Sequence, residues 1–273
     1  MAPTTRPKDA ADTTDAAVPA GSIKSAERVL QILDLVARHT DGIDASGIRA
    51  SLKLPRSSLH GLLRVLSDRG YLFVDPDSRV YRVGLHAWEV GQAYSHNQNI
   101  SVLIGPEMRA LRDELNETVQ LAVLDGLDNV YLAKEESDHP LRLVSGVGLR
   151  LPAHTTALGK VLLAGLPAGE VRRRLAGVTL QRFTKSTIGD KAELLRRLAA
   201  VRASGFAEDD GEYTVGLYCV AVPVRSESGA VVAAVSCSTP SARAGATGDR
   251  AQRYLPALRA CAGRLAPLIA PLS

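Results

Sequence analysis

The densest group of chemically capable side chains lies in the run GFAEDDGEYTVGLYCVAVPV, residues 205–224. It holds Asp209, Asp210, Glu212 and Cys219. Clustered carboxylates can bind a metal ion, but no histidine lies at ligand spacing, so we predict no metal site. Cys219 stands in an apolar, strand-like pattern that is typical of a buried structural cysteine. We predict no catalytic residue; a thiol-dependent enzyme that uses Cys219, His154 and Asp209 is the alternative.

A second segment, LPAHTTALGKVLLAGLP (residues 151–167), contains a glycine–lysine pair of the kind that binds phosphate. A P-loop is excluded because His154 and Val161 occupy positions that need glycine and serine or threonine. The nearby GVGLRL fails the dinucleotide fingerprint because Leu151 replaces its third glycine. No cofactor is therefore predicted. What remains is a helix start near Thr155 whose free amides suit an anion, or which Thr155 or Thr156 merely caps.

A third group of side chains lies on one face of the stretch LPRSSLHGLLRVLSDRGYL, residues 54–72. Leu59, Leu62, Leu63 and Leu66 recur at helical spacing and predict a buried stripe. The opposite face has no carboxylate before Asp68. That face carries Arg56, Ser57, Ser58, His60, Gly61 and Arg64.

Charge is concentrated around this helix. Between Ser46 and Leu72 there are five cations and a single anion, Asp68. The local net charge of +4 equals the net charge of the whole chain. DNA phosphates favour such a concentration through counterion release. A solvated cationic face, or a face that contacts another protein, is the alternative. The predicted DNA-contacting residues are Lys53, Arg56, Ser57, Ser58, His60, Gly61, Arg64 and Arg79.

Each of these residue types has a physical role on DNA. Serines and amides at a helix N-terminus can donate to phosphates, whereas Arg64 and His60 can reach base edges in the major groove. Gly61 would let the helix backbone lie close to the duplex. Arg79 and Arg82 lie on the hairpin that follows.

The elements around the basic helix predict a winged helix-turn-helix. A first helix starts with Ser25 as N-cap, Asp44 caps a short second helix, and Pro55 opens the third, which ends at Gly70. YLFV and RVYRV flank the turn DPDS and predict a hairpin. A small structural subdomain without a ligand is the alternative.

The remaining chain predicts a helical connector and then an α+β domain. Helices are expected at 85–95, 101–116, 155–165, 167–175 and 190–204. Strands are expected at TVQLAVLD and NVYLAKE, with a hairpin in CVAVPVRSESGAVVAAVSCS around SESG. The tail from 242 to 273 is helix-prone, with breaks at Pro256 and Pro267. We expect a disordered tail at 1–21, the winged helix at 22–84, the connector at 85–99 and the second domain at 100–273.

Length and composition agree with two globular domains. The 273 residues are 45% hydrophobic and 23% charged. The three cysteines form no C-x-x-C pair, which fits a reducing compartment. The first twenty residues lack the apolar core of a signal peptide, and no apolar run reaches the ~18 residues that a membrane span needs. A cytoplasmic protein without a membrane partner is expected.

Taken together, these segments resemble the IclR family of bacterial transcription regulators. The resemblance runs from about Ser25 to Pro240 and is carried by LPAHTTALGKVLLA, FTKSTI, GFAEDDGEYTVGLYCVAVPV and VVAAVSCSTP. It implies a winged helix and a GAF-like effector-binding domain. It further implies a dimer or dimer of dimers on palindromic double-stranded DNA, controlled by a small organic acid.

The resemblance also implies where the effector binds. The amides of Ala157 and Leu158 would hold the anionic end of the ligand. Ser236 and Ser238 alternate along a strand, so both hydroxyls project from one face, opposite Cys237. Because an ionised Asp209 would repel a ligand carboxylate, it is expected to accept a ligand hydroxyl or hydrated carbonyl, or to be protonated, which favours hydroxy- and oxo-acids. The family's polar contacts fall on Asp209, Cys219, Ser236 and Ser238, and its apolar walls on Leu143, Leu151 and Leu217.

Overall fold

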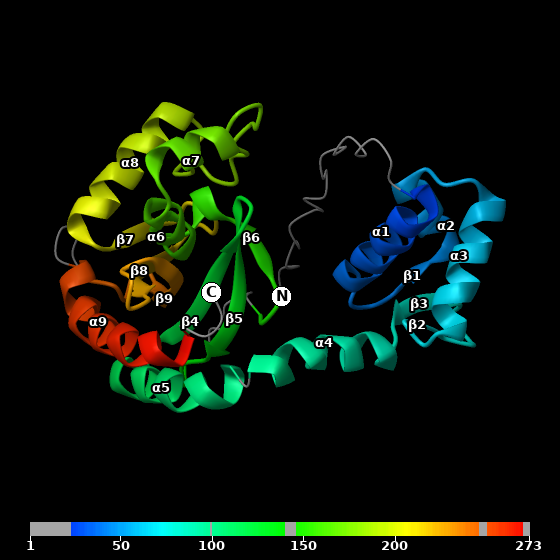
Figure 1. The fold of residues 1–273 in the computed structure, drawn as a ribbon, viewed down its shortest axis with the longest axis horizontal. Helices are drawn as coiled ribbons and strands as arrows, with labels where there is room; N and C mark the ends of the chain where they lie inside the picture. Colours follow the sequence, from blue (N-terminus) through cyan, green and yellow to red (C-terminus); the bar gives the residue numbers. More distant parts are fainter. Residues whose placement is uncertain (1–22, 99, 140–145, 246–249, 270–273) are drawn as a thin grey trace, which may run out of the picture. The chain divides into compact units, whose positions relative to one another are not determined.

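The computed structural model describes residues 23–98, 100–139, 146–245 and 250–269 (Figure 1). It divides the chain into two compact units, Met1–Tyr94 and Ser95–Ser273. The helix α4 (Leu85–Gln98) contains the point of division.

The first unit is a winged helix-turn-helix, as the sequence predicts. Its small antiparallel sheet has the strand order β1-β3-β2. Its core consists of apolar side chains from all three helices and the sheet, among them Ile32, Ile48 and Leu63. The elements are α1 (Lys24–Arg38), β1 (Ile43–Asp44), α2 (Ala45–Leu52), α3 (Arg56–Asp68), β2 (Leu72–Val74) and β3 (Val80–Val83).

Helix boundaries in this unit follow the expected signals with one exception. Asp44 caps α2 by accepting from the Gly47 amide at 2.8 Å, and Gly70 ends α3 with a φ of +73°. The predicted N-cap at Ser25 is wrong. Helix α1 already begins at Lys24, and Ile23, which precedes it in extended conformation, makes no side-chain cap bond. The serine is thus inside the helix.

The second unit is built on a six-stranded antiparallel sheet with the order β6-β5-β4-β9-β8-β7. The predicted hairpin around SESG joins β8 to β9, whereas the β4–β9 pairing joins strands more than a hundred residues apart. The elements are α5 (Ile100–Leu115), β4 (Thr118–Asp125), β5 (Asp128–Glu135), β6 (Arg150–Pro152), the 3₁₀ turn η1 (Ala153–Thr155), α6 (Ala157–Gly165), α7 (Ala168–Arg174), α8 (Lys191–Ser204), β7 (Ala207–Asp210), β8 (Leu217–Arg225), β9 (Val231–Pro240) and α9 (Arg250–Ile269).

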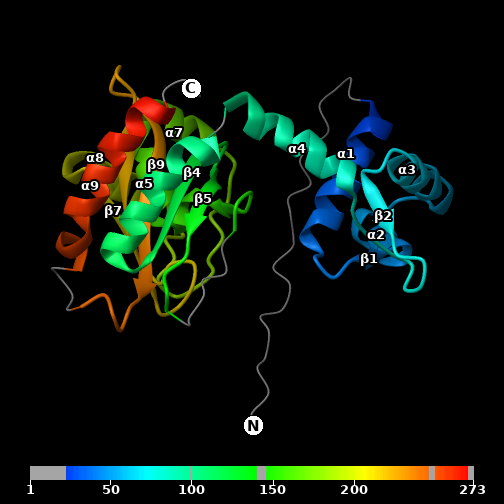
Figure 2. The ribbon, with the colours of Figure 1, turned by 90° about the horizontal axis from the view of Figure 1, so that it is seen from below.

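Helices cover both faces of this sheet. Helices α5 and α9 lie side by side on one face (Figure 2). There Met108, Tyr254 and Leu258 pack against Val220 and Val235. Helices α6, α7 and α8 form the layer on the other face, with Leu163, Val171 and Leu198 in its core. The unit is therefore α+β, and the second face holds the polar site described below.

The C-terminal helix differs from the prediction. Pro256 and Pro267 do not break it, and α9 runs through both from Arg250 to Ile269. Both prolines are exposed, and the carbonyls that lose a donor belong to the exposed Gln252 and Gly263, which water can reach. Burial of the opposite face holds the helix together. None of the helices described combines the length and apolarity needed to cross a membrane.

Candidate functional site

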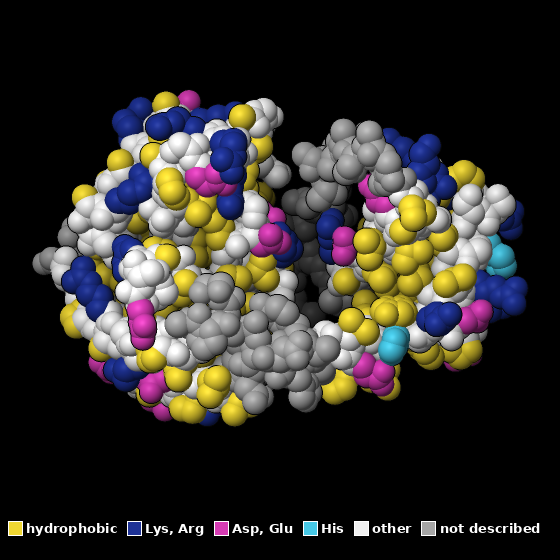
Figure 3. Space-filling model, in the orientation of Figure 1, with side chains coloured by type: hydrophobic (Ala, Val, Ile, Leu, Met, Phe, Trp, Pro, Cys, Tyr) yellow, Lys and Arg dark blue, Asp and Glu magenta, His cyan; other side chains and the backbone are white. Residues whose placement is uncertain are grey.

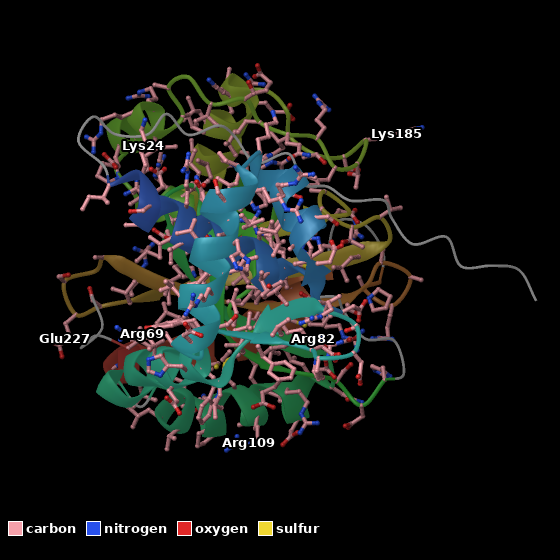
Figure 4. All side chains as sticks on the ribbon, turned by 90° about the vertical axis from the view of Figure 1, so that its right-hand side faces the viewer. Lys24, Arg69, Arg82, Arg109, Lys185 and Glu227 are labelled. Carbon is pink, nitrogen blue, oxygen red and sulfur yellow. The ribbon has the colours of Figure 1, made fainter. Side chains whose placement is uncertain are left out.

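The basic helix is α3, and it presents the expected two faces. Leu59, Leu63 and Leu66 are each 3% exposed, whereas Arg56 and Arg64 on the other face are exposed. Helix α3 crosses the face of the first unit, with Arg69 just past its C-terminal end and Arg82 on β3 (Figure 4). The expected residues Ser57, His60, Gly61, Lys53 and Arg79 are also exposed, and Ser58 is half-buried.

Two of the expected residues line a groove between α2, α3 and β3. The groove has a volume of about 390 Å³ and brings Arg49, Arg56 and His60 together over Leu59 and Leu63. Ser46 and Tyr81 also line it, and sequence reasoning missed both. Tyr81 was not found because its place beside α3 depends on the pairing of β3 with β1.

Gly61 and Arg79 have unusual local surroundings. A Cβ on Gly61 would meet no atom within 4 Å, so packing inside the protein does not require glycine there. Arg79 has a φ of +58° in the hairpin turn, where Asp75 accepts from two following amides and fixes the wing.

Arg64 lies 3.6 Å from Asp68, but both side chains are largely exposed, so this pair leaves the guanidinium accessible.

In the second unit, the strand register builds a polar row across the sheet. Thr118 of β4 lies opposite Ser238 of β9, which lies opposite Cys219 of β8, which lies opposite Asp209 of β7. Directly opposed residues project from the same face. Four residues distant in sequence therefore share one face, and it is the face covered by α6.

A second row two residues along the strands contains Gln120 opposite Ser236. Gln120 joins the rows, because its Oε1 accepts hydrogen bonds from Ser238 Oγ at 3.0 Å and Ser236 Oγ at 3.4 Å. Ser238 Oγ also lies 3.1 Å from Sγ of Cys219. Cys237 packs on the other face with α5 and α9, which confirms the expected alternation. Gln120 was missed, although a lone amide in the apolar run TVQLAVLD was the available signal.

The N-terminus of α6 lies on the same side of the sheet as these rows, and its first amides are not satisfied within the helix. Thr156 caps the helix by accepting from Gly159 N at 2.9 Å, and its hydroxyl donates to Asn129 Oδ1 at 2.7 Å. The amides of Ala157 and Leu158 come first in the helix and have no intrahelical acceptor. Asn129 is fully buried, and its Nδ2 has no partner within the described part of the chain. The helix end therefore combines a threonine cap with donors available to an anion.

A buried group of charges lies beside the polar rows. Lys160 of α6 is fully buried and forms an ion pair with Glu212, whose other oxygen has no partner among the described residues. Asp209 accepts from the Glu212 amide at 2.7 Å. Burial raises the pKa of Asp209 to about 7, against the opposing effects of the Lys160 charge and this hydrogen bond. Sequence reasoning assigned Lys160 no role, although it lies in the rejected phosphate loop and in the family segment LPAHTTALGKVLLA.

Apolar side chains adjoin the polar rows. Leu151 is buried and Leu217 is half-buried, and both belong to the core cluster that contains Cys219 and Leu158. Leu143 lies outside the described residues. Two of the three expected wall residues thus lie on the same side of the sheet as the polar rows.

The residues of the thiol-enzyme alternative are not arranged for nucleophilic catalysis. His154 Nε2 lies 3.0 Å from the carbonyl of Gln181, and no hydrogen bond joins it to Cys219. Burial, followed by the neighbouring Asp209 carboxyl, raises the pKa of Cys219 far above its usual value, so the nucleophilic thiolate is disfavoured. Within the described ranges, no group of three or more His, Cys, Asp or Glu residues is arranged to hold a metal ion.

Comparison with known proteins covers both units. Residues 25–76 match the IclR helix-turn-helix domain, and residues 92–266 match the bacterial transcriptional regulator IclR C-terminal domain. The chain is 36% identical over 217 residues to the HTH-type transcriptional repressor AllR of Klebsiella pneumoniae, which covers 80% of each protein. It is also 36% identical over 221 residues to the HTH-type transcriptional regulator XynR of Escherichia coli strain K12, over 81% of this chain and 88% of XynR.

The fold agrees with these matches. The crystal structure of an IclR homolog complexed with 4-hydroxybenzoate, from Microbacterium hydrocarbonoxydans, superposes with a TM-score of 0.77 at 27% identity, over 91% of this chain and all of the other. A winged helix followed by an effector-binding domain defines a ligand-responsive transcription regulator rather than an enzyme. The chain belongs to the IclR family of bacterial transcription regulators.

Proposed function

We propose that this regulator binds a small hydroxy-, oxo- or aromatic acid in its C-terminal domain and that the acid controls operator binding. The observation that carries the proposal is that Asp209, Ser236 and Ser238 share the sheet face covered by α6. On that face both serine hydroxyls donate to Gln120. Amides of Ala157 and Leu158 suit a carboxylate. A cytoplasmic location is proposed as well, because DNA is the partner and the three cysteines are free.

The polar rows favour an acid with a second polar group. The serine hydroxyls can donate to a carboxylate, whereas Asp209 can accept from a ligand hydroxyl or a hydrated carbonyl. The IclR homolog from Microbacterium hydrocarbonoxydans carries 4-hydroxybenzoate, an acid with a hydroxyl group. A plain fatty acid would offer Asp209 no donor beyond the Glu212 amide, and burial of an unmatched polar group lowers affinity.

Titration of the full chain with a panel of small acids tests the proposal. We expect calorimetric binding of at least one hydroxy- or oxo-acid, and a change in operator affinity in a gel shift when that acid is present. Matched acids without the hydroxyl or carbonyl serve as controls. Equal binding of the matched fatty acids would contradict the proposed role of Asp209, and no change in the gel shift would contradict effector control.

For the DNA face, we propose that Arg56 contacts phosphate and Arg64 contacts a base. Arg56→Ala should weaken binding to all sequences alike and lower the salt slope by about one unit. Arg64→Ala should cost about 1–3 kcal/mol and relax preference at one operator position. Fluorescence anisotropy over a salt series measures both, with the exposed Arg38→Ala on α1 as control. Parent-like binding by both variants would mean that α3 does not face DNA.

We further propose that the protein acts as a dimer or a dimer of dimers on a palindrome. Helix α4 exposes Leu85 and Trp88 by 70% and 61%, which suits an apolar contact between copies. Sedimentation should give at least a dimer, and footprinting should give half-sites about one helical turn or a multiple apart. Leu85→Ser/Trp88→Ser should shift the mass toward the monomer, whereas Val215→Ser, a control at another exposed site, should not. Protection of one unpaired half-site by a monomer would contradict dimeric binding.

A further inference from the structure

A second strongly basic segment of the chain lies outside the winged helix. Residues 166–205 contain nine cations and three carboxylates, whereas residues 23–84 contain ten cations and seven carboxylates. Because the whole chain carries only +4, the remainder outside residues 166–205 is net negative. This excess in the effector-binding unit has no role in the proposed effector site.

The structure places this charge on α7, α8 and the loop between them. Some cations are used internally: Arg173 and Arg174 pair with Glu170, and Arg202 donates to the carbonyls of Ala164 and Leu166. Five others are exposed and form no ion pair within the described part of the chain. These five, which we call the α7–α8 face, are Arg172, Arg182, Lys185, Arg196 and Arg197.

The packing of the two helices explains why these side chains point outward. Val171 of α7 and Leu194 and Leu198 of α8 are buried against the sheet layer, so neighbouring arginines lie on the solvent side. Dark blue side chains gather over the part of the unit that holds α7 and α8 (Figure 3). Lys185 extends from the tip of its loop (Figure 4).

The chemistry of the surface favours a polyanion over another folded protein as its partner. Specific protein–protein contacts depend on apolar or aromatic anchors at their centre. Between residues 166 and 205 no large hydrophobic side chain is among those strongly exposed. A face of guanidinium and ammonium groups without such anchors fits a phosphate backbone, where affinity comes from counterion release.

We propose that the α7–α8 face is a second DNA-contacting surface, which binds phosphates without reading sequence. The inference takes from the proposed function only that DNA is the partner of this chain. DNA bound by the winged helix is held at high local concentration near the same polypeptide, so a second weak contact adds to the overall affinity. The contact should lengthen the protected region without adding a sequence requirement.

Arg172→Ala/Arg196→Ala/Arg197→Ala in the full chain tests the proposal. On a duplex several helical turns long, the slope of log affinity against log salt should become shallower by about two to three units, at about 0.9 per phosphate contact. Affinity at moderate salt should fall at least tenfold, equally for operator and unrelated sequence. Arg225→Ala/Arg253→Ala/Arg259→Ala removes the same charge from exposed positions elsewhere in this unit and should change neither quantity strongly.

A charge-conserving variant of the same positions and a variant of the winged helix serve as further controls. Arg172→Lys/Arg196→Lys/Arg197→Lys should retain most of the parent slope, because charge alone attracts the phosphates. Equal slopes for the alanine triple variant and its control variant would overturn the inference. Arg56→Ala, measured beside them, would then show whether the winged helix itself contributes to the salt slope. A loss confined to operator sequence would also overturn it, since phosphate contacts do not discriminate bases.

Discussion

Lys160→Met is expected to lower the free energy of unfolding of the effector-binding unit by about 3–5 kcal/mol. The ammonium is fully buried and pairs with Glu212, which is itself buried. Without the lysine, the Glu212 carboxylate would be left in the interior without its cation, next to Asp209. Methionine keeps the length and apolar stem of the side chain, so the loss reports on charge rather than on a cavity.

The double variant Lys160→Met/Glu212→Gln distinguishes the effect of one unpaired buried charge from the effect of losing the whole ion pair. Removing both charges should recover most of the lost stability. Removal of one partner leaves an unpaired buried charge, which lowers the free energy of unfolding more than removal of both partners does. Calorimetry measures the unfolding, and fluorescence of Trp88, the single tryptophan, follows the other unit. Lys185→Met, at an exposed position, is the control. A single variant as stable as the parent would show that the pair is not needed for stability.

The winged helix could be predicted from the sequence because its signals are local. The apolar stripe of α3, the Asp44 cap and the turn at Gly70 each lie within one or two turns of the element they specify. The same kind of local signal gave wrong predictions of the N-cap at Ser25 and of helix breaks at the prolines of α9. In α9, packing of Tyr254 and Leu258 against the sheet outweighs the lost helical hydrogen bonds.

The candidate effector site was predictable only in part because it depends on strand register. Family motifs placed Asp209, Cys219, Ser236 and Ser238 by residue, and the register brings them to one face. Gln120 could not be found in this way, since its contact with Ser238 joins strands 118 residues apart. The burial of Lys160 was also hidden, because its carboxylate partner lies 52 residues away along the chain.

Ser236→Ala and Ser238→Ala are each expected to weaken effector binding about ten- to more than a hundred-fold. A hydroxyl bonded to a charged ligand contributes about 1.5–3 kcal/mol. Both hydroxyls lie on the α6 side of β9 and reach Gln120, so each can turn to a ligand carboxylate at this place. Calorimetry with the identified acid measures the loss, with Ser226→Ala in the exposed turn as control. Operator binding without effector should stay at the parent level, and unchanged ligand affinity in both variants would place the pocket elsewhere.

The same titration should depend on pH through Asp209. Its pKa is raised to about 7 chiefly by burial, so the carboxyl is neutral below this value and ionised above it. An ionised Asp209 repels the ligand carboxylate, so affinity should be highest below pH 7 and fall by up to about tenfold for each unit above it. Asp209→Asn keeps an oxygen that can accept from the Glu212 amide but cannot ionise, and it should flatten this profile. An equally steep profile in Asp209→Asn would assign the pH dependence to another group.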